Sequence, residues 1–451
     1  MLDTLSIAII RYIIMKKSAL TITLINGLVT AIQIVGQIVV ARLFGARIQL
    51  DAFVSAVTIP TILTTVIAAT LSDAFLPILK KKQIDNEEKA NKYFFRTAFI
   101  VSIIVLIITF CLDLFSTKLL GALFGVRGLN FVTMTDTLMK YMVYTLPFTI
   151  IGTFSNAYLY SKKQFLLPSI SYFLGSIVNL ALIIILSPLI GITSMVVGFV
   201  VAIVLQFFLV FPYKIRSYIF TAIKSINIKS IKLELPGLFY SWLPLIISTL
   251  ILGFGTVLAR FFSARLPEGY IVYVNLVTKL FAGLIGIMTI GIQTVFFPHL
   301  IELIHTNNFE RAKLQVNKAK LYGFILTIGT VMVIIFIAPF FMRLLLTGGK
   351  FSGKNVEILI SLFPYFIIPS VGWGISQIFF QPIIAIGKQH LLTLVNIGAV
   401  FLSWISATYV YGQFDGMMAI SVGLIVLTFT GIIGAEIIWR KELKSRLSSG
   451  H

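Results

Sequence analysis

Residues 164–213 read QFLLPSISYFLGSIVNLALIIILSPLIGITSMVVGFVVAIVLQFFLVFPY and contain no charged residue. A membrane-spanning helix needs about 20 consecutive apolar residues, so this stretch is long enough for two of them. We predict that they cover 165–188 and 190–212. Helices suit such a stretch because each one satisfies its own backbone hydrogen bonds in hydrocarbon. A membrane β-barrel would instead be built from short segments of alternating hydrophobicity.

The rest of the chain resembles this stretch in composition. Of its 451 residues, 58% are hydrophobic and only 12% are charged, whereas a soluble domain usually has about 25% charged residues. A soluble globule of this composition would have too little polar surface to cover its outside. We therefore predict an all-α polytopic membrane protein with about twelve transmembrane helices. The other spans are placed near 18–44, 50–79, 94–114, 133–160, 237–264, 270–302, 318–343, 354–386, 389–411 and 415–439. Within them Pro60, Pro147, Pro244, Pro364 and Pro369 are candidate kinks.

The distribution of Lys and Arg predicts the orientation of the chain. The net charge is +20, and most of the 36 Lys and Arg residues fall in segments that share one side of the membrane. By the positive-inside rule, that side is the cytoplasm and both termini lie there. The sequence thus predicts a multi-pass protein of the bacterial inner membrane, without a nucleic-acid partner.

The two halves of the chain contain similar short motifs at nearly the same offset. SKKQF at 161–165 corresponds to IGKQH at 386–390, and DAFLP at 73–77 corresponds to TVFFP at 294–298. Because six spans separate the copies, both halves begin on the same side, which makes this a parallel internal repeat of two six-helix bundles. Such repeats commonly place a substrate site between the bundles. The predicted parts are an interfacial segment (1–17), two bundles (18–212 and 237–441), a basic cytoplasmic connector (213–236) and a tail (442–451).

Charged residues inside spans point to the binding site. A central Arg or Lys costs roughly 2.5–3.5 kcal/mol on insertion scales, and Arg42, Arg260 and Lys279 are placed within predicted spans. Guanidinium groups grip phosphate oxygens in pairs, and Lys acts as a mobile point charge. We predict that these three cations bind an anionic substrate such as a lipid diphosphate. The alternative is that Arg42 and Arg260 extend to the lipid headgroups.

The carboxylates inside spans have structural and functional interpretations. Asp136 and Lys140 are four residues apart, in the order that favours a helical ion pair, although Asp136 could also couple transport to an ion. Asp51 begins its span and is expected to cap that helix, with cation binding or gating as the alternative. Asp73 could carry a proton or sodium ion, or it could be solvated at the interface.

Signatures of catalysis and of cofactor binding are missing from the sequence. We find no phosphate-binding glycine loop, no zinc-ligand spacing and no Ser/His/Asp arrangement, and Cys111 is the only cysteine. A disulfide framework and a cysteine metal site are therefore excluded. We expect neither an enzyme nor a cofactor or metal.

Two groups of short motifs are typical of one transporter family. The first group is ARLFGA at 41–46, DAF at 51–53, Ile59-Pro60 and DAFLP at 73–77. The second is Arg260, LPEG at 266–269, Gly283, Gly286, Pro298 and GGKF at 348–351. Together they resemble the MurJ/MviN family of lipid II flippases, within the multidrug/oligosaccharidyl-lipid/polysaccharide exporter superfamily. The resemblance implies two six-helix bundles around a positively charged central cavity. It also implies transport by alternating access of a polyprenyl-diphosphate-linked saccharide for peptidoglycan, cell-wall or polysaccharide export.

Several family arginines are replaced in this chain. They fall here on Thr30, Gly36 (followed by Gln37), Thr64, Thr65 and Leu276. Arg260 is kept, and Lys279 lies one helical turn beyond Leu276, where it could partly restore the charge. The resemblance therefore implies a lipid-linked glycan as the substrate, and the replacements favour one other than lipid II.

We carry three hypotheses forward. The first is a flippase in which Arg260 and Lys279 bind the phosphate, with Arg42 in support. The second is a drug or organic-cation antiporter of the same superfamily, which needs a buried carboxylate facing the cavity. The third is a non-transporting membrane scaffold that recruits glycan-synthesis proteins. Membrane lipids are expected partners under all three hypotheses.

Overall fold

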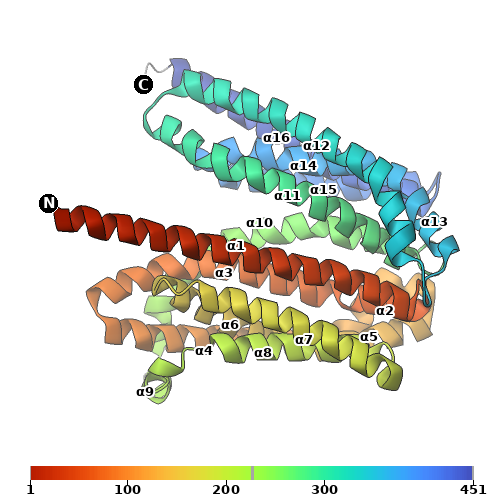
Figure 1. The fold of residues 1–451 in the computed structure, drawn as a ribbon, viewed down its shortest axis with the longest axis horizontal. Coiled ribbons are helices and arrows are strands. Elements are labelled where there is room, and N and C mark those ends of the chain that lie inside the picture. Colours follow the sequence, from red (N-terminus) through yellow and green to blue (C-terminus); the bar gives the residue numbers. More distant parts are fainter. Residues whose placement is uncertain (1, 225–227, 449–451) are drawn as a thin grey trace. The chain divides into compact units, whose positions relative to one another are not determined.

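A computed structural model of the chain describes residues 2–224 and 228–448. Parts of the predicted N-terminal segment, connector and tail, at 1, 225–227 and 449–451, lie outside the described residues. The described chain is helical, as the sequence predicted (Figure 1). Its α-helices are α1 (Leu2–Phe44), α2 (Ile48–Ala56), α3 (Thr58–Asp85), α4 (Glu87–Phe124), α5 (Leu129–Val143), α6 (Leu146–Ser161), α7 (Leu166–Ile190), α8 (Thr193–Val210), α9 (Tyr218–Lys224), α10 (Ile228–Ser263), α11 (Tyr270–His305), α12 (Phe309–Leu346), α13 (Gly353–Ser361), α14 (Phe363–Ala385), α15 (Gln389–Tyr411) and α16 (Gly416–Ser448).

Most membrane spans follow the prediction, but two predicted spans differ. The predicted span at 354–386 is divided into α13 and α14, and its apolar crossing segment is Phe363–Ala385. Within the described residues, eleven segments are long and apolar enough to cross a membrane. The predicted span at 133–160 is not one of them, because it is divided into the shorter helices α5 and α6. The predicted interfacial segment 1–17 has no helix end of its own, since α1 runs on from Leu2 into the first span.

Proline explains where several spans are divided. Pro60, Pro147 and Pro364 each lie in the first turn of a helix, namely α3, α6 and α14. Proline is tolerated there because the N–H that it lacks would have no partner in the helix. Pro244 and Pro369 stay inside the continuous helices α10 and α14. Three of the five candidate kinks are therefore helix breaks.

The chain forms two compact units. Unit 1 contains residues 1–43, 56–125 and 129–246, and unit 2 contains 44–55, 126–128 and 247–451. Neither unit is a single continuous half of the chain. The α2 segment and the short turn at 126–128 belong to unit 2, although both come from the first half of the sequence.

An aromatic cluster at the centre of unit 1 joins α3, α4 and α6. The Phe75 ring meets the Phe154 ring edge-on at 4.6 Å and stacks on Tyr93 at 5.7 Å. All three side chains are buried. Along the outside of the unit, large apolar side chains such as Ile185 and Leu189 on α7 are exposed. This arrangement fits a unit whose outer surface faces lipid.

Close helix packing characterises unit 2, in which α11 and α12 pack against α14, and α16 packs against α14 and α15. The Phe281 ring of α11 meets the Phe363 ring of α14 edge-on at 5.5 Å. At Gly372 of α14, a Cβ atom would lie only 2.5 Å from the Thr428 hydroxyl of α16. A small residue at such a position lets two helices in a membrane approach closely.

Candidate functional site

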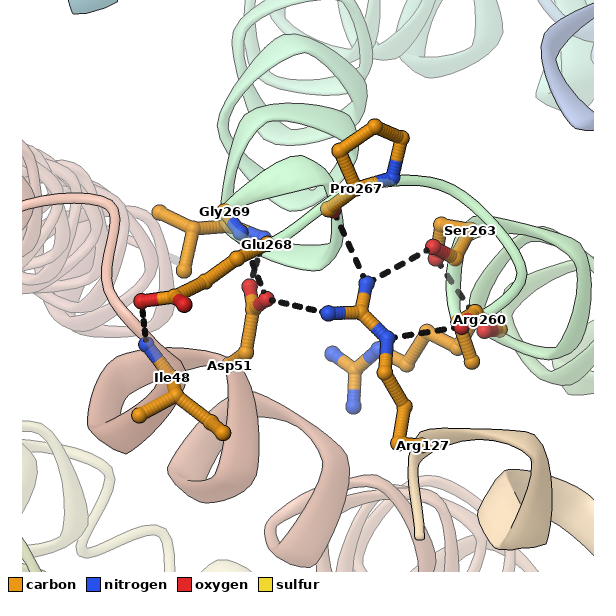
Figure 2. Close-up of polar contacts among 10 residues, drawn as sticks. Ile48, Asp51, Arg127, Arg260, Ser263, Pro267, Glu268 and Gly269 are labelled. Atoms are coloured by element: carbon orange, nitrogen blue, oxygen red, sulfur yellow. Dashed lines mark hydrogen bonds and ion pairs between the residues drawn. The ribbon is translucent and has the colours of Figure 1, made fainter. Parts of the chain in front are cut away.

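A buried carboxylate organises one end of unit 2. Asp51, in the first turn of α2, has no exposed surface. It accepts hydrogen bonds from the backbone N–H of Gly269 at 2.7 Å and of Val272 at 3.0 Å, at the start of α11 (Figure 2). The first N–H groups of a helix have no partner within the helix, and a negative charge there is favourable. The sequence correctly predicted a capping role for Asp51 but assigned it to the wrong helix, because it caps α11.

A second carboxylate, that of Glu268, caps the helix α2 that contains Asp51. The Glu268 side chain accepts a hydrogen bond of 2.7 Å from the backbone N–H of Ile48, the first residue of α2. Asp51 of α2 thus caps the start of α11, and Glu268, just before α11, caps the start of α2 (Figure 2). The arrangement needs Gly269, whose φ of +89° is left-handed and whose Cβ would lie 2.7 Å from the Ala46 carbonyl oxygen.

Arg127 connects its own turn to α2 and to the segment between α10 and α11, all within unit 2. Its Nε donates to the Ala264 carbonyl at 2.7 Å, and one terminal nitrogen donates to the carbonyls of Ser263 at 3.3 Å and Pro267 at 3.0 Å. The other terminal nitrogen lies 3.5 Å from the Asp51 carboxylate (Figure 2). A cation is favourable at the last carbonyls of a helix, here those of α10. The sequence analysis missed Arg127, because it lies in a short turn outside every recognised motif.

Arg260 is buried next to this cluster. Only 8% of its surface is exposed. Its guanidinium donates to the Val54 carbonyl of α2 at 2.5 Å and to the Asn275 side chain of α11 at 3.2 Å. Arg260 therefore does not extend freely to headgroups, and its charge is held in place by α2 and α11.

Lys279 presents a second cation one turn beyond Asn275 on α11. Its side chain is exposed, and no hydrogen bond or ion pair within the described residues occupies its ammonium group. The neighbouring Asn275 accepts a hydrogen bond from Arg260 at 3.2 Å. Arg260, Asn275 and Lys279 thus form a polar strip on unit 2, which we call the cationic strip.

The remaining predicted site residues lie in unit 1. Arg42 is exposed in the last turn of α1, and Asp73 is exposed on α3. Asp136 is buried and lies 3.3 Å from Lys140, which confirms the predicted helical pair. It also accepts hydrogen bonds from the hydroxyls of Ser116 and Thr117 on α4.

No metal centre is formed by the described residues, which contain no group of three or more His, Cys, Asp or Glu side chains suited to hold a metal ion. The contacts of Asp51 and Asp136 are instead those of helix capping and ion pairing.

Comparisons with known proteins give a consistent result. The family model described as lipid II flippase MurJ matches residues 40–382. A curated relative, the probable lipid II flippase MurJ of Buchnera aphidicola subsp. Schizaphis graminum (strain Sg), is 23% identical over 395 residues, which cover 84% of this chain and 75% of the relative.

Solved structures share the fold. A lipid II flippase MurJ in an inward closed conformation matches with a TM-score of 0.76 at 20% identity, over 94% of this chain and 89% of that one. An inward-facing multidrug resistance MATE transporter of the MOP superfamily matches with a TM-score of 0.73 at 14% identity, over 94% and 96%. The family model covers most of the sequence, and the chain therefore belongs to the lipid II flippase MurJ family.

Proposed function

We propose that the protein is a flippase that moves a polyprenyl-(di)phosphate-linked saccharide, a peptidoglycan precursor or another cell-envelope glycan, across the bacterial inner membrane by alternating access. The substrate class comes from the family, whose relatives are named as lipid II flippases. The observation that carries the proposal for this chain is the exposed Lys279, which lies one helical turn from Asn275, the residue that the fixed guanidinium of Arg260 contacts.

The cationic strip has the properties that an anionic headgroup requires. An exposed ammonium inside a span is costly when it faces lipid, so it is expected to face water or a bound anion. Arg260 and Lys279 both carry a positive charge, and an anionic phosphate group is attracted to both. The hydrogen bonds from Arg260 to Val54 and Asn275 hold the guanidinium in position before the substrate arrives. Arg42, which is exposed in the last turn of α1, is a further candidate for binding an anionic group.

The Asp51 cluster supports a role in gating. Segments 44–55 and 126–128 are part of unit 2, yet each connects helices of unit 1 along the chain. The contacts of Asp51, Arg127 and Glu268 hold these two segments to the rest of unit 2. We propose that these contacts form and break during the transport cycle, with both termini on the cytoplasmic side.

The antiporter alternative needs a buried carboxylate that is available to a cation. Asp51 and Asp136 are the buried carboxylates of the described residues. Asp51 is engaged by Arg127 and the start of α11, and Asp136 is engaged by Lys140 and two hydroxyls. We therefore favour an anionic substrate.

Substitution of Lys279 tests the proposal. Purified variants are compared by native mass spectrometry for binding of a polyprenyl-diphosphate disaccharide, and in proteoliposomes for its translocation. Loss of one charge-assisted hydrogen bond, about 1.5–3 kcal/mol, should weaken binding roughly tenfold to a hundredfold in Lys279→Gln. Lys279→Arg keeps the charge and should retain binding.

The matched control is Lys354→Gln, which removes an exposed lysine of unit 2 outside the spans. It should bind and translocate like wild type. The phosphate assignment fails if Lys279→Gln binds the lipid as tightly as this control, and the flippase proposal fails if wild-type protein neither binds nor moves the lipid.

A further inference from the structure

Unit 1 contains a cavity with an uncharged polar lining. It has a volume of about 420 Å³ and is bounded by α3, α6, α7 and α8. Ligand sites in proteins usually measure about 300–1,000 Å³, so the cavity is large enough for one. Eight of its fourteen lining residues carry a hydroxyl or amide group, and none is charged. We call it the Thr64–Asn156 cavity.

Several hydroxyl groups of this lining already donate their hydrogens to backbone carbonyls. Thr149 donates its hydroxyl hydrogen to the Thr145 carbonyl at 3.1 Å, and Thr153 donates to the Thr149 carbonyl at 2.8 Å. Ser171 donates to the Pro168 carbonyl at 2.7 Å. A hydroxyl has one hydrogen and two lone pairs, so each of these groups keeps lone pairs for another donor.

Two further lining atoms have no partner at all. The Thr64 hydroxyl oxygen and the Asn156 side-chain oxygen are both buried without a hydrogen bond in the structure. Only 9% of the Asn156 surface is exposed. Buried polar atoms in proteins are nearly always hydrogen-bonded, because an unpaired one costs free energy. These two oxygens could therefore accept hydrogen bonds from a ligand.

Aromatic rings form part of the same wall. Phe148 of α6 and Phe207 of α8 both line the cavity, with their rings in a T-shaped contact at 5.6 Å. Tyr172 of α7 adds a third ring. Apolar and aromatic walls with a few placed polar groups are typical of sites for small organic molecules.

The lining excludes charged ligands. A phosphate or carboxylate has only acceptor atoms and would find no cation and few donors here. An organic cation would find no carboxylate to balance its charge. Thr64 and Thr65 of α3 contribute two of the hydroxyl groups of this lining. A neutral molecule with many hydroxyl groups, such as a sugar, supplies the donors that the lining lacks.

We propose that the Thr64–Asn156 cavity binds a sugar ring of the lipid-linked saccharide. This inference rests on the proposed function and adds to it a site for the neutral part of the substrate. Its hydroxyls donate to Thr64, Asn156 and the threonines of α6, while the ring packs against the aromatic side chains. With such a site, the affinity of the protein for the lipid-linked saccharide depends on its sugar as well as on its phosphate.

The experiment compares two probes, a polyprenyl-diphosphate disaccharide and the same polyprenyl diphosphate without sugar. The dissociation constant for each is measured by native mass spectrometry in wild type and in a Thr64→Val/Asn156→Leu variant. Both substitutions keep the side-chain size and remove the unpaired oxygens. We expect about a tenfold or greater loss of affinity for the saccharide lipid and unchanged affinity for the bare lipid.

Two further variants separate binding from stability. Thr109→Val removes a buried, unpartnered hydroxyl of α4 that lies outside the cavity, and it should leave both affinities unchanged. Gly152→Ala adds a methyl group to the lining with only an ordinary contact of 3.9 Å to Phe207. It should weaken binding of the saccharide lipid alone, without lowering the melting temperature.

The outcomes distinguish this inference from the proposed function. If wild type binds both lipids equally well, or if the cavity variants weaken both to the same extent, the sugar site is refuted while the phosphate proposal stands. If wild type binds neither lipid, the flippase proposal and the sugar site both fail. Tighter binding of an organic cation such as tetraphenylphosphonium than of the saccharide lipid, lost in the cavity variants, would also overturn the inference and would favour the antiporter.

Discussion

Asp51 and Glu268 each cap the helix that begins beside the other residue. Asp51 accepts hydrogen bonds from the N–H groups at the start of α11, and Glu268 accepts one from the N–H of Ile48 at the start of α2. Their surroundings differ, because Asp51 is fully buried and paired with Arg127, whereas Glu268 is exposed. The two caps should therefore contribute very differently to stability.

Removing the buried cap should be the more damaging change. Asp51→Ala leaves two N–H groups without their acceptor and Arg127 without its counter-charge. We expect the free energy of unfolding to fall by about 3 kcal/mol or more. Glu268→Ala removes an exposed cap and should cost about 0.5–1 kcal/mol. The apparent melting temperatures of the two variants in detergent measure the difference, and equal shifts would contradict the role given to burial.

Arg127 and Asp51 should be energetically coupled. A double-mutant cycle with Arg127→Ala and Asp51→Ala should give an interaction free energy of about 1–3 kcal/mol, because the two groups share one buried network. Arg127→Lys should not restore stability, since an ammonium cannot reproduce the planar fork that contacts three carbonyls. Additive effects of the two alanine substitutions would show that the 3.5 Å contact contributes nothing.

Much of the fold follows from local sequence. The apolar runs predicted the spans, because each helix must cross the same thickness of hydrocarbon with its own residues. The position of proline explains the breaks before α3, α6 and α14. The division of the predicted 133–160 span was missed, because two helices with one short break have the same hydropathy as one continuous helix.

The candidate site was only partly predictable. Arg260 and Lys279 were found because a charge inside an apolar run is unusual, and the pair of Asp136 and Lys140 follows from helical spacing. The partner of Asp51 could not be found, because its contacts with Gly269 and Val272 join segments that are 218 and 221 residues apart. Arg127 has no local signal, since an arginine in an outer turn is ordinary.

Gly269 offers a test of the geometry around Asp51. Gly269 and Gly128 have similar left-handed conformations, with φ of +89° and +87°. A Cβ at Gly269 would lie 2.7 Å from the Ala46 carbonyl oxygen, whereas a Cβ at Gly128 would have nothing within 4 Å. Gly128→Ala should cost about 1–2 kcal/mol for its backbone conformation alone. Gly269→Ala should cost clearly more, and thermal unfolding of the two variants gives the difference. Equal losses would mean that α2 can move away from Gly269 without cost.

The orientation proposed for the chain can be tested through its single cysteine. Cys111 is exposed, so a Cys111→Ser background removes the native thiol. Lys89 lies in a basic segment that the positive-inside rule assigns to the cytoplasm. Gly353, the first residue of α13, lies between two predicted spans on the opposite side. Both positions are exposed, and a Cβ at Gly353 has nothing within 4 Å.

In intact spheroplasts, a membrane-impermeant maleimide should label Gly353→Cys and leave Lys89→Cys unlabelled until the membrane is opened. The two sites are separated by an odd number of predicted spans, so they must respond oppositely in either orientation. Labelling of Lys89→Cys from outside, with protection of Gly353→Cys, would invert the proposed orientation and place the Asp51 cluster at the cytoplasmic side. Labelling of both from the same side would instead refute the predicted number of spans between them.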